Sequence, residues 1–190
     1  MTLGEHSNPP AADLTATLVV RLRTRHPEAG ALLHQLFRDA LLRFCWGYLG
    51  RMEEAEDAVQ DISFKVLRAA DVPEFFRPWL YKIARNHCLN MIRDRANRKD
   101  RRALPAASQV DEALTGHLTR LVKDEVRSRL AELVANLAES QREVLRLRYV
   151  EDLSRPEIAE VLDVPESVVK SRLFEGLKTL REQASQLEER

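Results

Sequence analysis

Residues 151–182 read EDLSRPEIAEVLDVPESVVKSRLFEGLKTLRE, and this stretch predicts two short helices joined by a tight turn. Ser154 and Glu157 have the spacing of a capping box, in which each side chain bonds to the other residue's backbone N–H at a helix start. Pro156 fits the first turn of that helix, where a missing N–H breaks no hydrogen bond. Pro165 disfavours helix at the residue before it, so the first helix ends there. The second helix has a predicted buried face of Val169, Leu173, Leu177 and Leu180.

Two short helices joined by a turn of about three residues form the helix-turn-helix, which sets its second helix in the major groove of DNA. Polar and aromatic side chains of the second helix lie off its predicted buried face. We expect the cations there to meet phosphates and the other side chains to give base preference. The candidate DNA-binding residues are Ser167, Lys170, Ser171, Arg172, Phe174 and Lys178. A plain helical hairpin at the end of a bundle is the alternative for this segment alone.

The composition narrows the class of protein. Charged residues make up 32% and aromatic residues 6% of the 190 residues, which favours a soluble, helical protein. The formal net charge is zero, so any affinity for DNA must come from local basic patches. No secretory signal opens the chain, and no apolar run approaches the ~20 residues of a membrane span. We therefore expect a cytoplasmic protein with no direct insertion into the membrane.

The distribution of apolar residues predicts an all-α protein with two small helical domains joined by a flexible linker. A helix is expected over Leu14–Arg25, and further helices with breaks near Gly47–Gly50 and at Asp71–Pro78. The linker is polar and carries Pro105 and Gly116. The predicted boundaries are 1–28 for an N-terminal extension, 29–100 for the first domain, 101–124 for the linker, 125–184 for the second domain and 185–190 for a tail.

The first domain contains an acidic segment, residues 53–61, that holds no Lys or Arg. On a helix, Ala55, Val59, Ile62 and Val66 take the buried side of this segment. The opposite side is acidic with an aromatic ring at its edge, which suits docking to a basic partner. The plainer interpretation is an ordinary solvated helix face. The candidate docking residues are Glu53, Asp57, Gln60, Asp61 and Phe64.

The next helix, predicted over Pro78–Arg95, has two faces of different chemistry. Leu80, Ala84, Cys88 and Met91 share one arc of about 80° and form its buried side. The second face combines a ring that stacks on unpaired bases, amides that bond base edges, and cations that meet phosphates, so it suits single-stranded nucleic acid. Alternatively the tryptophan belongs to the core, and the basic run at 93–102 is a solvated helix end. The candidate residues are Trp79, Lys82, Asn86, Asn90 and Arg93.

These segments together resemble a bacterial sigma factor of the sigma-70 family, in its extracytoplasmic-function group. EEAEDAVQDISFKVLRA followed by FRPWLYKIARNHCLNMIRDR is similar to conserved region 2, and LAESQREVLRLRYVEDLSRPEIAEVLDVPESVVKSRLFEGLKTLRE is similar to region 4. The resemblance implies that the first domain binds the β′ clamp helices of RNA polymerase core and melts the −10 element of promoter DNA. It implies that the second domain binds the β flap and reads the −35 element. Members of this group are commonly held inactive by an anti-sigma factor, which is therefore an expected partner.

Two features depart from the family pattern. The connection between Arg68 and Trp79 is a few residues shorter than usual, and that segment normally helps to form a pocket for a flipped base. Glu166 and Glu175 make the recognition helix less basic than usual, which predicts weaker or differently specified −35 binding. Gly176 in the middle of that helix costs about 1 kcal/mol relative to Ala.

Functions of other classes fit the residues less well. A helix-turn-helix regulator acting without core polymerase would need an effector or dimer domain, and residues 29–96 show no signature of one. An anti-sigma-like adaptor would leave Lys170–Arg172 unexplained. His87 and Cys88 are adjacent and point in different directions, so they do not make a zinc site. We expect no enzyme activity, no cofactor and no metal, and we expect Cys45 and Cys88 to be buried thiols rather than oxidant sensors.

Overall fold

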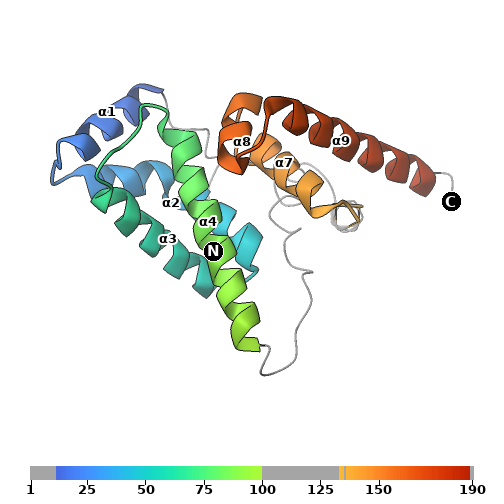
Figure 1. Cartoon of the computed structure of the whole chain (residues 1–190), viewed down its shortest axis with the longest axis horizontal. Helices are drawn as coiled ribbons and strands as arrows, with labels where there is room; N and C mark the ends of the chain where they lie inside the picture. The colour runs from blue at the N-terminus through green and yellow to red at the C-terminus, as the bar shows by residue number, and fades with distance from the viewer. Residues whose placement is uncertain (1–11, 100–132, 135, 189–190) are drawn as a thin grey trace. The chain divides into compact units, whose positions relative to one another are not determined.

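The computed structural model describes residues 12–99, 133–134 and 136–188, and this part of the chain is helical with short connections and no strand (Figure 1). It falls into two compact units, with α1–α4 in the first and α7–α9 in the second. The predicted all-α, two-domain fold is thereby confirmed. The helices are α1 (Ala12–Arg23), α2 (Ala29–Leu49), α3 (Met52–Arg68), α4 (Phe76–Lys99), α7 (Glu139–Tyr149), α8 (Arg155–Leu162) and α9 (Glu166–Glu188).

Several predictions concern residues that lie outside the described part of the chain. These are the first residues of the N-terminal extension, the linker at 101–124, the end of the basic run at 93–102, and the end of the C-terminal tail. The first residues of the second domain, predicted to begin at 125, are also outside it as far as 132.

Helix α2 is the centre of the first unit, since α1, α3 and α4 all pack against it. Its inward side is apolar, and Phe37 and Phe44 are almost fully buried. The ring of Phe37 lies 5.4 Å from that of Phe76 at the start of α4, and the ring of Phe44 lies 5.1 Å from that of Tyr81. These ring contacts fix α4 against α2, because edge-to-face aromatic pairs add to the free energy of apolar burial.

The break between α2 and α3 is shorter than the sequence suggested. Gly47 lies inside α2 and is buried, and only Gly50 ends the helix, with φ 71° in the left-handed region. Its N–H donates to the carbonyl oxygen of Trp46 at 2.8 Å. A left-handed residue after the last turn is a common way to end a helix, and Gly adopts it without a steric cost.

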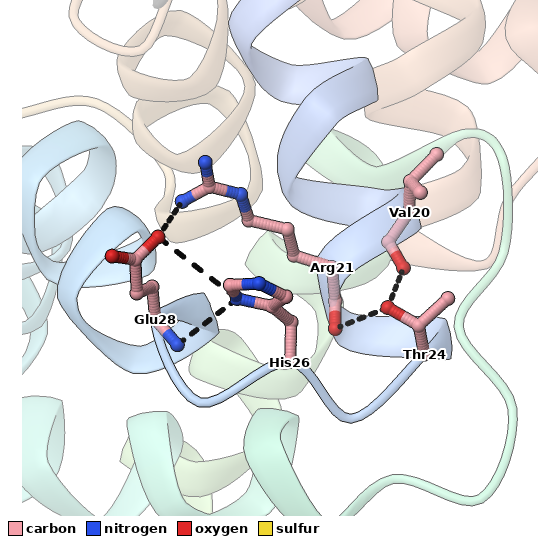
Figure 2. Close-up of polar contacts among 5 residues, drawn as sticks. All are labelled: Val20, Arg21, Thr24, His26 and Glu28. Carbon is pink, nitrogen blue, oxygen red and sulfur yellow. Dashed lines mark hydrogen bonds and ion pairs between the residues drawn. The ribbon is translucent and has the colours of Figure 1, made fainter.

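Helix α1 lies in the extension predicted at 1–28, yet it packs on α2 and buries Leu18, Val19 and Leu22. A short turn links the two helices, and Figure 2 shows its polar contacts. Arg21 Nη1 lies 3.1 Å from Glu28 Oε2, and the Glu28 N–H donates to His26 Nδ1 at 3.2 Å. The helix predicted over Leu14–Arg25 is thus present, shifted by two residues toward the N-terminus.

The second unit is built from α7, α8 and α9, with α9 packed on both of the others. The predicted capping box at the start of α8 is confirmed: Ser154 N–H donates to Glu157 Oε2 at 2.7 Å, and Glu157 N–H donates to Ser154 Oγ at 3.4 Å. Helix α8 ends at Asp163, which adopts φ 56° and ψ 48°. Pro165 then precedes α9, as the sequence predicted.

One predicted feature of α9 is wrong. Leu177 was assigned to the buried face, but it is 40% exposed, and Gly176 is buried in its place. A Cβ atom on Gly176 would lie 3.1 Å from Leu145 Cδ1, so α7 approaches α9 closely at this point. The buried line therefore runs through Val169, Leu173 and Gly176, and the glycine is needed for close helix packing.

Candidate polymerase and nucleic-acid interfaces

The acidic surface predicted on α3 is exposed in the first unit. Ala55, Val59, Ile62 and Val66 are buried below it, as their spacing predicted. The side chains above them lie within an arc of about 100° on the solvent side of α3. All five are exposed and three of them are carboxylates, so they are available to a basic partner. We call this set, Glu53, Asp57, Gln60, Asp61 and Phe64, the docking face.

Two contacts shape the edges of the docking face. Phe64 is 52% exposed, and the guanidinium carbon of Arg68 lies 6.0 Å from the centre of its ring. Glu54, beside the face, lies 3.5 Å from Arg95 on α4 and 3.2 Å from Arg51. Within the face itself, Glu53 Oε2 lies 3.5 Å from Arg51 Nη2, and Glu53, Asp57 and Asp61 are all exposed.

His87 joins the docking face to α4. Lys65 Nζ donates to His87 Nδ1 at 2.7 Å, and His87 Nε2 lies 3.5 Å from Asp61 Oδ2. Because Nδ1 accepts a hydrogen bond, the imidazole is neutral with its proton on Nε2. Burial lowers the pKa of His87 below its ordinary 6.5, the Lys65 ammonium lowers it further, and the Asp61 carboxylate acts in the opposite direction.

The outward side of α4 carries the residues predicted to bind single-stranded DNA. Leu80, Ala84 and Cys88 are fully buried, while Met91 is half-buried. The opposite side spans an arc of about 80° and is directed to solvent. Asn86 and Asn90 are exposed on it, one turn apart. We call this set, Trp79, Lys82, Asn86, Asn90 and Arg93, the strand-reading face.

Asn90 and Arg93 are bonded to each other within this face. Arg93 Nη1 donates to Asn90 Oδ1 at 3.0 Å. This bond orients the Asn90 amide, whose oxygen keeps a second lone pair and whose NH₂ group keeps both of its donors. Asn86 and Asn90 are therefore both able to donate and to accept hydrogen bonds.

Trp79 is half-buried. This result lies between the two interpretations from the sequence, a ring exposed for stacking on bases and a ring buried in the core. Its ring lies 5.7 Å from that of Phe76, at an angle of 49°. An aromatic side chain that the sequence analysis did not single out lies just before the helix: Phe75 is 75% exposed. An exposed ring of this size is a better stacking surface for an unpaired base than the half-buried indole.

The second unit presents its candidate residues on α9, next to α8. Five of them lie within an arc of about 100° on the outward side, opposite the contacts with α7 and α8. Phe174 is 64% exposed, and the exposed Leu177 lies beside it. Arg172 differs from the rest because it is half-buried, on the flank of the buried line. We call the outward set, Ser167, Lys170, Ser171, Phe174 and Lys178, the recognition face.

The acidic residues of α9 are partly neutralised within the unit. Glu166 Oε1 lies 3.3 Å from Arg155 Nε, so this pair joins the starts of α8 and α9. Glu182 lies 3.9 Å from Lys178. The negative charge that the sequence placed at the start of the recognition helix is therefore offset by a cation that the sequence analysis did not consider.

A cavity of about 410 Å³ lies beside the recognition helix. It is lined by Arg148, Tyr149, Ser154, Arg155, Pro156 and Leu173. Arg148 donates to the carbonyl oxygen of Leu153 at 3.0 Å, which holds its guanidinium at the rim. The cavity brings together two guanidinium groups, each with an acidic neighbour: Arg155 lies 3.3 Å from Glu166, and Arg148 lies 3.9 Å from Asp152. Sequence reasoning missed Arg148 and Arg155 as candidates because they lie on α7 and α8, outside the face of the second helix.

Metal-binding side chains and thiols are the remaining candidate chemical groups in the described part of the chain. There, no group of His, Cys, Asp and Glu side chains is arranged to hold a metal ion. Cys45 and Cys88 are both fully buried, as predicted, and they form no disulfide with each other. None of the helices in the described ranges is long and apolar enough to span a membrane.

Comparison with known proteins identifies the two units. The family model described as Sigma-70 region 2 matches residues 33–98, and the one described as Sigma-70, region 4 matches residues 127–180. The chain is 29% identical over 174 residues to the ECF RNA polymerase sigma factor SigW of Bacillus subtilis (strain 168), covering 84% of this chain and 91% of that protein. It is 30% identical over 166 residues to the ECF RNA polymerase sigma factor SigL of Mycobacterium tuberculosis (strain CDC 1551 / Oshkosh), covering 80% and 88%.

A solved structure supports the fold independently. The structure of CnrH in complex with the cytosolic domain of CnrY matches with a TM-score of 0.64 at 20% identity, covering 92% of this chain and 97% of that one. The chain belongs to the sigma-70 family, in its extracytoplasmic-function group, and it is a promoter-recognising sigma factor of RNA polymerase.

Proposed function

We propose that this sigma factor divides promoter recognition among three surfaces, each on one helix. The docking face of α3 binds RNA polymerase core at the β′ clamp helices, and the strand-reading face of α4 binds the non-template strand of the −10 element. The recognition face of α9 reads the −35 element in duplex DNA, while the second unit also binds the β flap. The working domains are 29–100 and 125–184, with α1 as an added part of the first.

The strand-reading face is the observation that carries this proposal. Asn86 and Asn90 are exposed one turn apart, and the hydrogen bond from Arg93 to the amide oxygen of Asn90 orients that side chain. The pairing edges of bases are accessible to short amide side chains only after the strands separate. A face of this kind discriminates open from closed DNA, which is the task of −10 recognition.

The docking face supports the proposal by its charge and exposure. Its carboxylates lie on the solvent side of α3, so a basic partner surface can approach without moving the core of the unit. Complementary charge raises the rate of such an encounter and excludes partners of the wrong sign. Core polymerase is the partner that the family assigns, and it acts in the cytoplasm, where we propose this chain works.

The recognition face suits duplex DNA for a different reason. In a helix-turn-helix, the second helix enters the major groove while the first crosses the backbone. Lys170 and Lys178 are placed to meet phosphates, and Ser167, Ser171 and Phe174 to contact bases. The cavity between Arg148 and Arg155 lies where the first helix starts, and we propose that it takes a backbone phosphate.

We also propose that an anti-sigma factor regulates this chain. The support is the family and the chemistry of the surfaces: Phe64 of the docking face, Phe174 of the recognition face and the neighbouring Leu177 are exposed apolar groups that an inhibitor can cover. Such a regulator would compete with core polymerase rather than modify the chain.

Run-off transcription with core polymerase tests the main proposal. Asn86→Ala with Asn90→Ala should leave core binding unchanged and reduce transcripts from a native promoter by at least about tenfold, because each lost base contact costs about 1–3 kcal/mol. On a template that is already melted over the −10 element, the loss should be smaller, but selectivity for the −10 bases should fall. Wild-type activity and selectivity on both templates would show that these amides do not read the strand.

A further inference from the structure

The connection between α3 and α4, residues 69–75, is a loop whose position decides where the strand-reading face begins. Val72 is 2% exposed and points into the first unit, whereas Phe75 is 75% exposed. Inside the loop itself, the Phe76 N–H donates to the carbonyl oxygen of Glu74 at 2.9 Å. Loop carbonyl groups without helix partners need donors from elsewhere, and these come from a distant part of the chain.

Two arginines at the end of α1 supply those donors. Arg25 Nη1 donates to the carbonyl oxygen of Leu67 at 2.7 Å, and Arg25 Nη2 donates to that of Ala69 at 2.9 Å. Arg23 Nε donates to the carbonyl oxygen of Val72 at 2.8 Å. The Arg25 guanidinium therefore caps the C-terminal end of α3, where a positive charge also meets the negative end of the helix dipole.

The backbone of Arg25 indicates that this side chain is not an incidental surface residue. Arg25 has φ 55°, in the left-handed region. Its N–H donates to the carbonyl oxygen of Leu22 at 3.2 Å, and the His26 N–H donates to that of Arg21 at 2.9 Å. These two bonds define a Schellman motif, in which the left-handed position is usually glycine. An arginine at this position accepts a steric cost that its guanidinium contacts can offset.

The clamped loop rests on a well-packed part of the unit. A Cβ atom on Gly30 would be 3.5 Å from Leu67 Cδ1, so the start of α2 lies close to the end of α3. On the other side of the loop, Phe76 contacts both Phe37 and Trp79. The arginines thus fix the backbone of a short segment whose two ends are already held by apolar packing.

We infer that Arg23 and Arg25 are positioning residues for −10 recognition, holding residues 69–75 so that Phe75 and the start of α4 are presented to the unpaired strand. This inference rests on the proposed function of the strand-reading face. It also assigns a role to α1, which lies before the matched region at 33–98. The arginines touch neither DNA nor core polymerase in this account and act only through the loop.

Hydrogen exchange on the free chain tests the clamp without reference to DNA. Arg25→Gly removes the guanidinium and relieves the left-handed backbone, so α1 should end normally. Arg23→Ala removes the third bond, and Arg21→Ala is the matched control, since Arg21 pairs with Glu28 and not with the loop (Figure 2). Exchange at the amides of Ala69 and Phe76 should become about tenfold faster in the first two variants and stay unchanged in the control.

Transcription with core polymerase then tests the consequence. Arg25→Gly should bind core as the wild type does and lose about fivefold in selectivity for −10 bases on a melted template, while Arg25→Lys, which keeps one charged donor, should recover part of it. Unchanged exchange would overturn the clamp, and faster exchange with wild-type selectivity would overturn the positioning role. If Asn86→Ala with Asn90→Ala also kept full selectivity, the proposed strand-reading face would be the part that fails.

Discussion

Helices α4 and α9 are of similar length and each presents a polar outer face. The two faces differ in chemistry and in the neighbouring segments that hold each helix in place. The face of α4 carries amides and is reached through a loop that bears an exposed aromatic ring. The face of α9 carries hydroxyls, lysines and an exposed phenylalanine, and it stands beside the capped helix α8. One arrangement suits bases splayed out of a strand, whereas the other suits a helix lying in a groove.

The difference teaches that the ligand of an exposed helix face is inferred from the neighbouring elements that hold the helix, as well as from the side chains on the face. A serine or an asparagine on a helix surface has many uses, and neither residue type alone indicates a ligand. On α9, the turn at Asp163 and the contact with α8 fix the angle at which the recognition face would meet DNA. On α4, the arginine-held loop and the pair between Asn90 and Arg93 fix the orientation of donors.

The largest effect should come from the docking face of α3, because the faces of α4 and α9 act only when the chain is bound to core polymerase. Glu53→Lys with Asp57→Lys replaces exposed negative charge on the docking face, so core association should weaken by more than tenfold at physiological salt. Asp61 is left in place because it contacts His87. Co-purification with core polymerase measures the loss.

Asp39→Lys with Glu160→Lys is the matched control for that experiment. Both residues are exposed and outside the docking face, and the variant has the same change in net charge. Equal binding of core by the two double variants would show that α3 does not provide the docking surface.

A substitution in the support of α9 should have the next largest effect. Gly176→Leu places a side chain where a Cβ atom alone would lie 3.1 Å from Leu145, so the second unit should lose about 1–3 kcal/mol of unfolding free energy. Glu175→Leu, on the exposed side of the same helix, should change stability by less than about 0.5 kcal/mol. Urea unfolding distinguishes the two, and equal stability would mean that α7 and α9 can separate at no cost.

Lys170 and Arg172, two of the cations of α9, should differ in their contribution to DNA binding. Lys170→Ala should weaken binding of a −35 duplex about fivefold and lower the salt slope by about one unit, as expected for one lost phosphate contact. Arg172→Ala should change the salt slope less, because Arg172 is half-buried beside the core. If Arg172→Ala changed the salt slope more than Lys170→Ala does, the side of α9 that faces the groove would be the side of Arg172, and the assignment of the recognition face would be wrong.

The smallest effect should be on the pH dependence of stability, through His87 on the side of α4 that faces α3. The folded-state pKa of His87 is lowered, so the unfolded chain binds this proton more readily. The contribution to stability is complete above pH 6.5 and is lost as the pH falls below that value. His87→Gln should remove this part of the pH dependence, as measured by urea unfolding at pH 7.5 and 5.5. A wild type and a variant with parallel pH profiles would contradict the assignment.

Much of this arrangement follows from local sequence signals. The capping box at Ser154, the helix ends near Pro165, and the buried and outward sides of α3 and α4 all follow from side-chain chemistry and helix period. These features were predictable because each depends on residues within a turn or two of one another.

The rest depends on contacts between distant residues. The exchange of Gly176 for Leu177 on the buried face results from how closely α7 approaches, which no local period encodes. Arg25 donates to carbonyl oxygens of residues more than forty positions away. Because every residue has a backbone carbonyl group, the sequence gives no sign of which residues a guanidinium will bond to in this way. The half-burial of Arg172 and the pairing of Arg155 with Glu166 were hidden for the same reason.

The central claim is that α4 reads the open strand and α9 reads the duplex. Its most direct test measures the affinity of holoenzyme for two probes, a single-stranded −10 non-template oligonucleotide and a −35 duplex. Asn86→Ala with Asn90→Ala should weaken binding of the first probe about tenfold and leave the second unchanged, and Lys170→Ala with Ser171→Ala should do the reverse. If both variants lost affinity for the same probe, or for both probes equally, the division between the two helices would be contradicted.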